Sequence, residues 1–141
     1  MSVIRAWKKV LEADLANIAN EVKELLGPPA VIVLDGPVGA GKTTFSKVFL
    51  GENNNTTSPT YSIINEVDNN LHADLYRIEK KEELIHLEIP MYLEEKEYFL
   101  IEWGMPYLSS LERIVGDEFK FYKLAIEINE NQTRSLFLSK L

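Results

Sequence analysis

The stretch "GPVGAGKTT", residues 36–44, has the residue types and the spacing of a phosphate-binding loop. It meets the pattern G-x-x-x-x-G-K-[ST] with Gly36, Gly41, Lys42 and Thr43. Glycines let successive backbone N–H groups curl around a phosphate because no Cβ stands in the way, and the helix that follows adds the positive end of its dipole. We expect Lys42 to bind the β and γ phosphates of a nucleotide and the Thr43 hydroxyl to complete a Mg²⁺ shell.

The segments on both sides of this loop support a nucleotide triphosphate site. Before it runs "AVIVLD" (30–35), a β-branched and aliphatic run that is typical of a strand buried on both faces. After it, "KTTFSKVFL" (42–50) predicts a helix that Gly51 ends. This context argues against the alternative, a glycine-rich turn with a chance lysine. The loop and helix residues expected to bind the nucleotide are Gly36, Val38, Gly39, Ala40, Gly41, Lys42, Thr43 and Thr44.

Two carboxylates are candidates for the chemistry that a phosphate loop alone does not provide. Glu102 closes "YFLIE", a buried-type run, and ligands of open α/β sheets bind at such strand ends. We predict that Glu102 and Thr43 are the Mg²⁺ ligands. Asp74, in "HADLYR", interrupts a strand-like run where aspartate is disfavoured, and is a candidate to orient the attacking water. The structural alternatives are a glutamate that merely ends a strand and a solvated hairpin aspartate.

Two further residues are candidates on weaker patterns. Thr60 follows a proline in "SPTY", and its hydroxyl and N–H are expected near the γ-phosphate, as in switch loops; an ordinary turn is the alternative. Trp103 follows Glu102 and is either a packed aromatic or part of the nucleotide site. His72 and His86 are isolated in the sequence, so we assign them no metal.

The kind of nucleotide protein is narrowed by what the chain does not contain. No N-K-x-D stretch for guanine occurs, which favours adenine, and hence ATP, or a loose choice of base. Small-molecule kinases usually bring several arginines on one lid to the transferring phosphoryl group. This chain has only four arginines, at 5, 77, 113 and 134, and no two of them are close in sequence. An ATP hydrolase is therefore favoured. A compact small-molecule kinase and a nucleotide-dependent binding module remain as alternatives.

The remaining elements predict one α/β domain over 1–141. Apolar residues at spacings of three and four predict an amphipathic helix over 3–26, so that 1–27 form an N-terminal helix ahead of a strand–loop–helix core at 30–51. We expect a P-loop NTPase-like fold, a mixed and partly parallel sheet flanked by helices. The other predicted elements are a hairpin of strands 61–67 and 71–78, a helix 80–89 ended by Pro90, a strand 97–103, a short helix 106–113, and a closing antiparallel pair 119–129 and 133–141.

Composition limits the partners and the compartment. The formal net charge is −7, so the chain is a poor candidate to hold tRNA or other nucleic acid except through a partner that supplies positive charge. There is no cysteine, which excludes disulfides and fits a reducing cytoplasm. The N-terminal stretch is interrupted by charges, and no run approaches the roughly 18 apolar residues of a membrane span. We expect a cytoplasmic protein without membrane contact.

Taken in order, "GPVGAGKTT", "SPTYSIINE", "HADLYR" and "IEW" resemble the TsaE (YjeE) family, from about residue 30 to the C-terminus. These are small bacterial ATPases of the tRNA threonylcarbamoyladenosine pathway. The resemblance implies a single P-loop domain, Mg-ATP held with Thr43, Thr60 and Glu102, and a nucleotide site that includes Asp74 and Trp103.

The resemblance also implies two protein partners, TsaD and TsaB. TsaD transfers the threonylcarbamoyl group to the tRNA adenosine, and ATP turnover by the TsaE-like protein would reset the complex between cycles. ATPase activity would then be weak alone and depend on the partners, and tRNA would be reached only through them. One stretch departs from the family. Members commonly continue the Glu-Trp pair with a further glutamate and an arginine, whereas this chain continues with "GMPYL".

Overall fold

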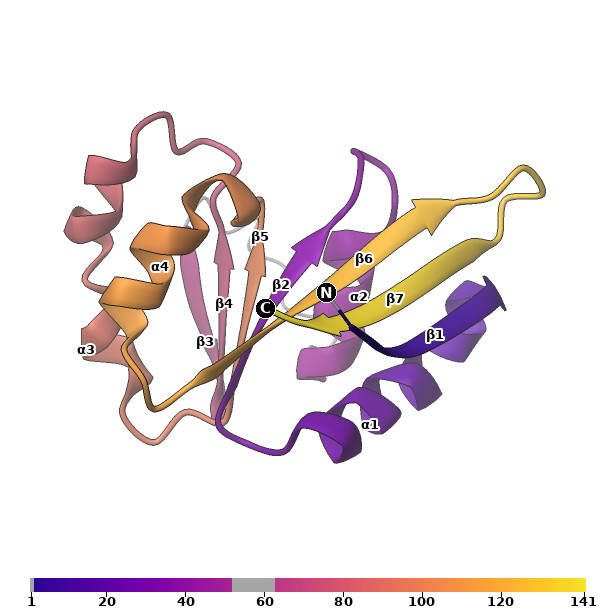
Figure 1. The fold of residues 1–141 in the computed structure, drawn as a ribbon, viewed down its shortest axis with the longest axis horizontal. Helices are drawn as coiled ribbons and strands as arrows, with labels where there is room; N and C mark the ends of the chain where they lie inside the picture. Colours follow the sequence, from indigo (N-terminus) through magenta and orange to yellow (C-terminus); the bar gives the residue numbers. More distant parts are fainter. Residues whose placement is uncertain (1, 52–62) are drawn as a thin grey trace.

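The computed structural model describes residues 2–51 and 63–141, which form one seven-stranded sheet with helices on both faces (Figure 1). The strand order is β1-β7-β6-β2-β5-β4-β3. The predicted α/β architecture with a mixed, partly parallel sheet is confirmed. The strands are β1 (Val3–Val10), β2 (Ala30–Asp35), β3 (Ile64–Val67), β4 (Asn70–Asp74), β5 (Tyr98–Glu102), β6 (Lys120–Ile128) and β7 (Arg134–Lys140).

The parallel strands occupy the centre of the sheet, and the antiparallel pairs lie outside them. β2 pairs in parallel with both β5 and β6, and β4 pairs in parallel with β5. All of Ala30–Leu34 is buried, as expected for a strand covered on both faces. β6 and β7 form the predicted antiparallel pair, and β3 and β4 form the predicted hairpin.

The helices form two layers, each with its own apolar core. Side chains of α1 (Leu15–Leu26) and α2 (Lys42–Leu50) pack on one face of the sheet, together with Ile32, Leu34 and Leu100. The other face is covered by three shorter elements: the 3₁₀ helix η2 (Lys81–Leu87), α3 (Ile89–Leu93) and α4 (Leu108–Val115). Two further 3₁₀ turns are η1 (Glu12–Asp14) and η3 (Met105–Tyr107). None of the helices in residues 2–51 and 63–141 has the length and apolar composition of a membrane span.

The prediction of one amphipathic helix over 3–26 is wrong for its first half. Val3–Val10 form an edge strand that pairs antiparallel with β7. Apolar residues spaced by three and four fit this segment only by coincidence, since backbone pairing with β7 decides its conformation. The chain turns where the Asp14 carboxylate accepts the Leu11 N–H at 2.8 Å, and α1 begins at the next residue. The predicted end of the helix at residue 26 is confirmed, because α1 ends at Leu26 and Gly27 caps it.

The segment 80–89 is also shorter and less regular than predicted. It forms the 3₁₀ helix η2, and Glu88 then adopts a left-handed conformation with φ 54°. Pro90 does not end a helix but lies in the first turn of α3, where its missing N–H is no loss. The second strand of the hairpin ends at Asp74 rather than 78, because its carboxylate accepts the Tyr76 N–H at 3.0 Å and starts a turn.

The buried side chain of Phe99 tests the core between the sheet and α4. Its exposed fraction is zero, and it lies on β5, on the face away from α1 and α2. We expect Phe99→Ala to lower the free energy of unfolding by about 3–5 kcal/mol, because it removes a large apolar side chain and leaves a cavity. Met91→Ala is the control, since Met91 is 69% exposed. Guanidinium unfolding measures both, and a loss below about 1 kcal/mol for Phe99→Ala would contradict this packing.

Candidate nucleotide-binding site

The candidate site lies at the carboxyl ends of β2, β5 and β4, three of the four parallel strands. In their register Leu34 pairs with Glu102, and Glu102 pairs with Asp74. The two carboxylates therefore lie on neighbouring strands at one edge of the sheet, beside the loop that leaves β2 at Asp35. This is the edge at which open α/β sheets bind ligands.

The phosphate-binding loop has the conformation its glycines were expected to allow. Gly41 precedes α2 with φ 106°, a conformation that side chains with a Cβ rarely adopt. Gly36 is needed for another reason: a Cβ there would lie 2.6 Å from the carbonyl oxygen of Ile126 in β6. α2 then begins at Lys42, so its first backbone N–H groups point to the space in front of the loop.

The Lys42 ammonium is held inside this loop. It donates to the carbonyl oxygen of Gly36, and its Nζ lies 3.5 Å from the centroid of the Trp103 ring. Burial lowers the pKa of Lys42, although the negative charges of Glu102, Asp35 and Asp74 oppose that shift. Lys42 is only 6% exposed. A cation at the mouth of a ring of backbone N–H groups is suited to bind a phosphate.

The Glu102 carboxylate is buried and faces α2. It is 2% exposed, and its Oε1 accepts a hydrogen bond from the Thr43 hydroxyl at 2.9 Å. Its Oε2 lies 2.6 Å from His72 Nε2. Burial by itself raises the pKa of this carboxyl, but the hydrogen bonds and charge of His72, the Thr43 hydroxyl and the Lys42 charge together hold the pKa below its ordinary value. Glu102 is therefore ionised near neutral pH.

The pair of Thr43 and Glu102 fits a Mg²⁺ ion that also has phosphate and water ligands. A hydroxyl and a carboxylate are hard oxygen ligands, and Mg²⁺ is usually bound by one or two protein groups plus substrate phosphates. Within residues 2–51 and 63–141, no three histidine, aspartate or glutamate side chains are grouped as a self-sufficient metal site. The donor set therefore suits a metal that arrives with a nucleotide.

A cavity of about 500 Å³ joins these groups. Most of the residues predicted for the site line it, and Tyr76 is an addition that the sequence reasoning missed. The predicted Gly36 and Ala40 do not line this cavity, and the predicted Thr60 lies outside the described residues. The lining residues are Val38, Gly39, Gly41, Lys42, Thr43, Thr44, Asp74, Tyr76, Glu102 and Trp103.

Trp103 forms part of this cavity because the backbone turns sharply after β5. Its φ is 62°, a left-handed value that is strained for a bulky aromatic residue. The ring lies over Lys42, and the Tyr76 ring lies against it with centroids 5.1 Å apart. Strain of this kind is concentrated at functional sites, which favours the nucleotide-site interpretation of Trp103.

A second cavity of about 290 Å³ lies on the other side of the phosphate loop. Apolar side chains of Leu11, Leu15 and Leu136 line it together with Gly39, Gly41 and Arg134. Arg134 Nε donates to the carbonyl oxygen of Ala40 at 2.9 Å, so this arginine supports the loop from β7. The sequence reasoning missed Arg134 because 94 residues separate it from Ala40.

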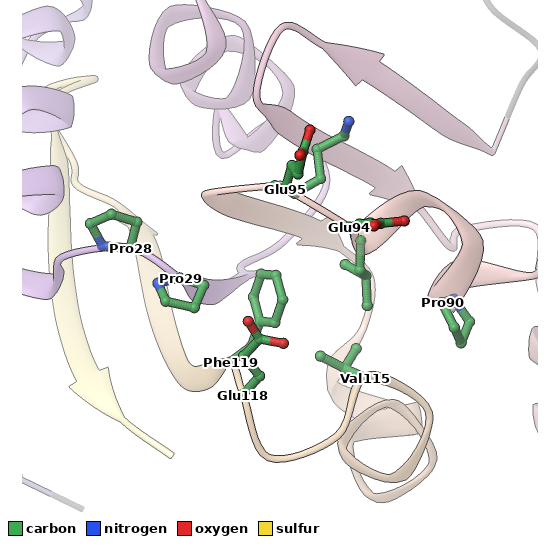
Figure 2. Close-up of a pocket in the computed structure, with 10 residues that line it drawn as sticks. Pro28, Pro29, Pro90, Glu94, Glu95, Val115, Glu118 and Phe119 are labelled. Atoms are coloured by element: carbon green, nitrogen blue, oxygen red, sulfur yellow. The ribbon is translucent and has the colours of Figure 1, made fainter.

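The structure has another cavity, of about 580 Å³, at the opposite end of the parallel strands (Figure 2). Pro28, Pro29 and Phe119 precede β2 and β6, and the carboxylates of Glu94 and Glu118 lie among the lining side chains. Lys96 also lines this cavity, but the carboxylates of Glu94, Glu95 and Glu118 outnumber it. An excess of negative charge is unsuited to a nucleotide's phosphates, which favours the cavities beside the phosphate loop as the nucleotide site.

Comparisons with known proteins identify the family of this chain. Residues 10–136 match the family model described as "Threonylcarbamoyl adenosine biosynthesis protein TsaE". The curated TsaE protein of Bacillus subtilis is 35% identical over 105 residues, which cover 70% of this chain and 65% of that protein. The protein of the same name from Rickettsia felis is 34% identical over 101 residues, or 66% of this chain and 58% of that protein.

The fold of this chain is also similar to that of a solved structure. The crystal structure of Bacillus subtilis YdiB superimposes with a TM-score of 0.65 and 25% sequence identity, over 100% of this chain and 89% of that one. The alignments to the two curated relatives span 65% and 58% of those proteins, somewhat less than two thirds of their length. The family model, the relatives and the fold agree, and the chain belongs to the TsaE family.

Proposed function

We propose that this protein binds Mg-ATP and hydrolyses it as an accessory factor of tRNA N6-threonylcarbamoyladenosine modification. The observation that carries the ATPase part is the meeting of Lys42, Thr43 and Glu102 at the carboxyl ends of the parallel strands. The modification pathway follows from membership of the TsaE family, whose model and relatives are named for threonylcarbamoyladenosine biosynthesis.

Each side chain has a distinct part in this proposal. Lys42 leaves the Gly36 carbonyl to bind the β and γ phosphates, to which the loop N–H groups also donate. Thr43 and Glu102 would hold Mg²⁺, which supplies positive charge against the phosphate oxygens. One carboxylate oxygen of Asp74 is used by the Tyr76 N–H, and the residue faces the same cavity, where it orients the attacking water.

The cavity beside Arg134 is the best place for the adenine base. It adjoins the loop at Gly39 and Gly41, so a nucleotide can extend from one cavity into the other. Its leucines offer apolar contact to a base, while Arg134 holds the carbonyl oxygens of Ala40 and, at 3.3 Å, of Gly39. Arg134 thereby keeps the loop in shape from the base side.

Resetting the modification complex is the step we assign to ATP turnover. The partners are a TsaD-like protein, which transfers the threonylcarbamoyl group, and a TsaB-like protein, which supports it. A chain with net charge −7 does not need to hold tRNA if these partners do so. Phosphate-dependent ordering of loops around a P-loop is a general way to convert ATP turnover into a conformational step.

Mutations of the three charged side chains of the site should affect ATP binding and ATP turnover differently. Lys42→Ala should weaken ATP binding by about 100-fold, because the ammonium that binds two phosphates is lost. In excess Mg²⁺, Glu102→Ala and Asp74→Ala should retain nucleotide binding and lose about 100-fold or more in turnover. Isothermal calorimetry and phosphate release measure the two effects. Lys47→Ala is the matched control, since Lys47 lies exposed on the same helix; normal hydrolysis by Glu102→Ala would remove it from the metal site.

The hydrogen bonds of Arg134 to the phosphate-binding loop can be tested by mutation. Arg134→Met keeps the length of the side chain and removes its donors to Ala40 and Gly39, so ATP affinity should fall about 10-fold. Arg113→Met, at an exposed position of α4, should leave the affinity unchanged. Binding of a fluorescent ATP analogue measures both variants. Equal affinities would show that the loop does not depend on this arginine.

The accessory role is tested by the ATPase rate of the purified chain, alone and with TsaD and TsaB added. We expect a slow rate alone and an increase of at least about tenfold with both partners, because the reset takes place only in the complex. Adding each partner separately is the control. A rate that the partners leave unchanged would overturn the reset role, and phosphorylation of a small-molecule acceptor would identify a kinase instead.

A further inference from the structure

His72 lies against the Glu102 carboxylate, although it is distant from the phosphate loop in sequence. Its Nε2 is 2.6 Å from Glu102 Oε2, and its side chain is 13% exposed. β4 and β5 run parallel, with His72 paired with Leu100 and Asp74 with Glu102. Since residues two apart share a face of the sheet, His72 and Asp74 point to the same side, and His72 reaches Glu102 diagonally.

The two carboxylate oxygens of Glu102 have different partners on different sides. Oε1 accepts from the Thr43 hydroxyl at 2.9 Å, toward the cavity. Oε2 faces His72 and also lies 3.4 Å from the Ser46 hydroxyl. With an ionised carboxylate as the acceptor, His72 donates from Nε2. The imidazole therefore holds the oxygen that does not face Thr43.

Without this donor the carboxylate would lose its shortest hydrogen bond. The remaining contact of Oε2, to Ser46, is long, and the Ser46 hydroxyl also lies 3.0 Å from the Lys42 carbonyl oxygen. A buried carboxylate with one oxygen poorly paired tends to rotate toward another donor. The Lys42 ammonium, whose charge acts on Glu102, is one such donor. A carboxylate that rotated away from its present orientation would no longer hold Oε1 at the Thr43 hydroxyl.

We propose that His72 is a positioning residue that orients the Glu102 carboxylate for Mg²⁺, so that its loss weakens Mg²⁺ binding more than nucleotide binding. The inference rests on the Mg²⁺ site of the proposed function. Groups that hold a metal ligand from outside typically contribute about 10–100-fold to metal affinity.

The test measures ADP affinity by calorimetry over a series of Mg²⁺ concentrations and in EDTA, so that no turnover is involved. We expect His72→Leu to bind ADP as the wild type does in EDTA, because the loop and Lys42 are intact. The Mg²⁺ concentration needed for half of the Mg²⁺-dependent tightening should rise about 10-fold or more. His86→Leu is the matched control, since His86 is exposed on η2.

Two polar variants separate a hydrogen bond from simple packing. The amide nitrogen of His72→Gln reaches about as far as Nε2, whereas that of His72→Asn stops one carbon short. We expect Gln to restore the Mg²⁺ response to within about threefold of wild type and Asn to behave like Leu. This pair also decides the matter if His72→Leu does not fold.

The outcomes distinguish this inference from the function on which it rests. If the ADP affinity of the wild type does not change with the Mg²⁺ concentration, the Mg²⁺ site of the proposed function is refuted. If Mg²⁺ tightens ADP binding to the wild type, and tightens it to the same extent in the Leu and Asn variants, only the role of His72 is wrong. Equal shifts in the Gln and Asn variants would overturn the hydrogen-bond mechanism, leaving His72 as a packing residue.

Discussion

The arrangement of the site depends on the hydrogen bonds of one buried carboxylate, that of Glu102. A charge at 2% exposure is costly unless it is paired, and here the donors come from Thr43 on α2 and His72 on β4. Its pairing therefore joins the helix that follows the phosphate loop to the strand that carries Asp74. Because these elements meet at one carboxylate, the groups suited to phosphate, metal and water occupy a single cavity.

The sheet allows this meeting because its central strands are parallel. β2, β5 and β4 end at the same edge, so one register places the start of the loop, Glu102 and Asp74 side by side. The antiparallel strands have a different effect, since β7 brings Arg134 to the back of the loop. The loop is thus held from both sides, by Trp103 over Lys42 and by Arg134 on the carbonyl of Ala40.

Predictions from the sequence succeeded where short-range pattern and burial agree. The strand 30–35, the loop and the helix 42–50 have the predicted bounds, because a fully buried strand, obligatory glycines and a capped helix are all local. They failed at 3–10, where the apolar spacing suits a helix but the edge of β7 offers unpaired backbone groups. Pro90 was misread because proline is tolerated in the first turn of a helix as well as just beyond its end.

The sequence by itself determined the phosphate loop, its flanking strand and helix, and the two carboxylates at strand ends, because each follows from residue types within a few positions. Only the tertiary structure decided that Val3–Val10 is a strand, that His72 holds Glu102 and that Arg134 supports the loop. These contacts depend on strand order and register, which bring residues far apart in the chain within hydrogen-bond distance. The spacing of residues along the chain does not show which strands are neighbours, so in the sequence His72 is an isolated histidine. Its contact with Glu102 depends on the pairing of β4 with β5.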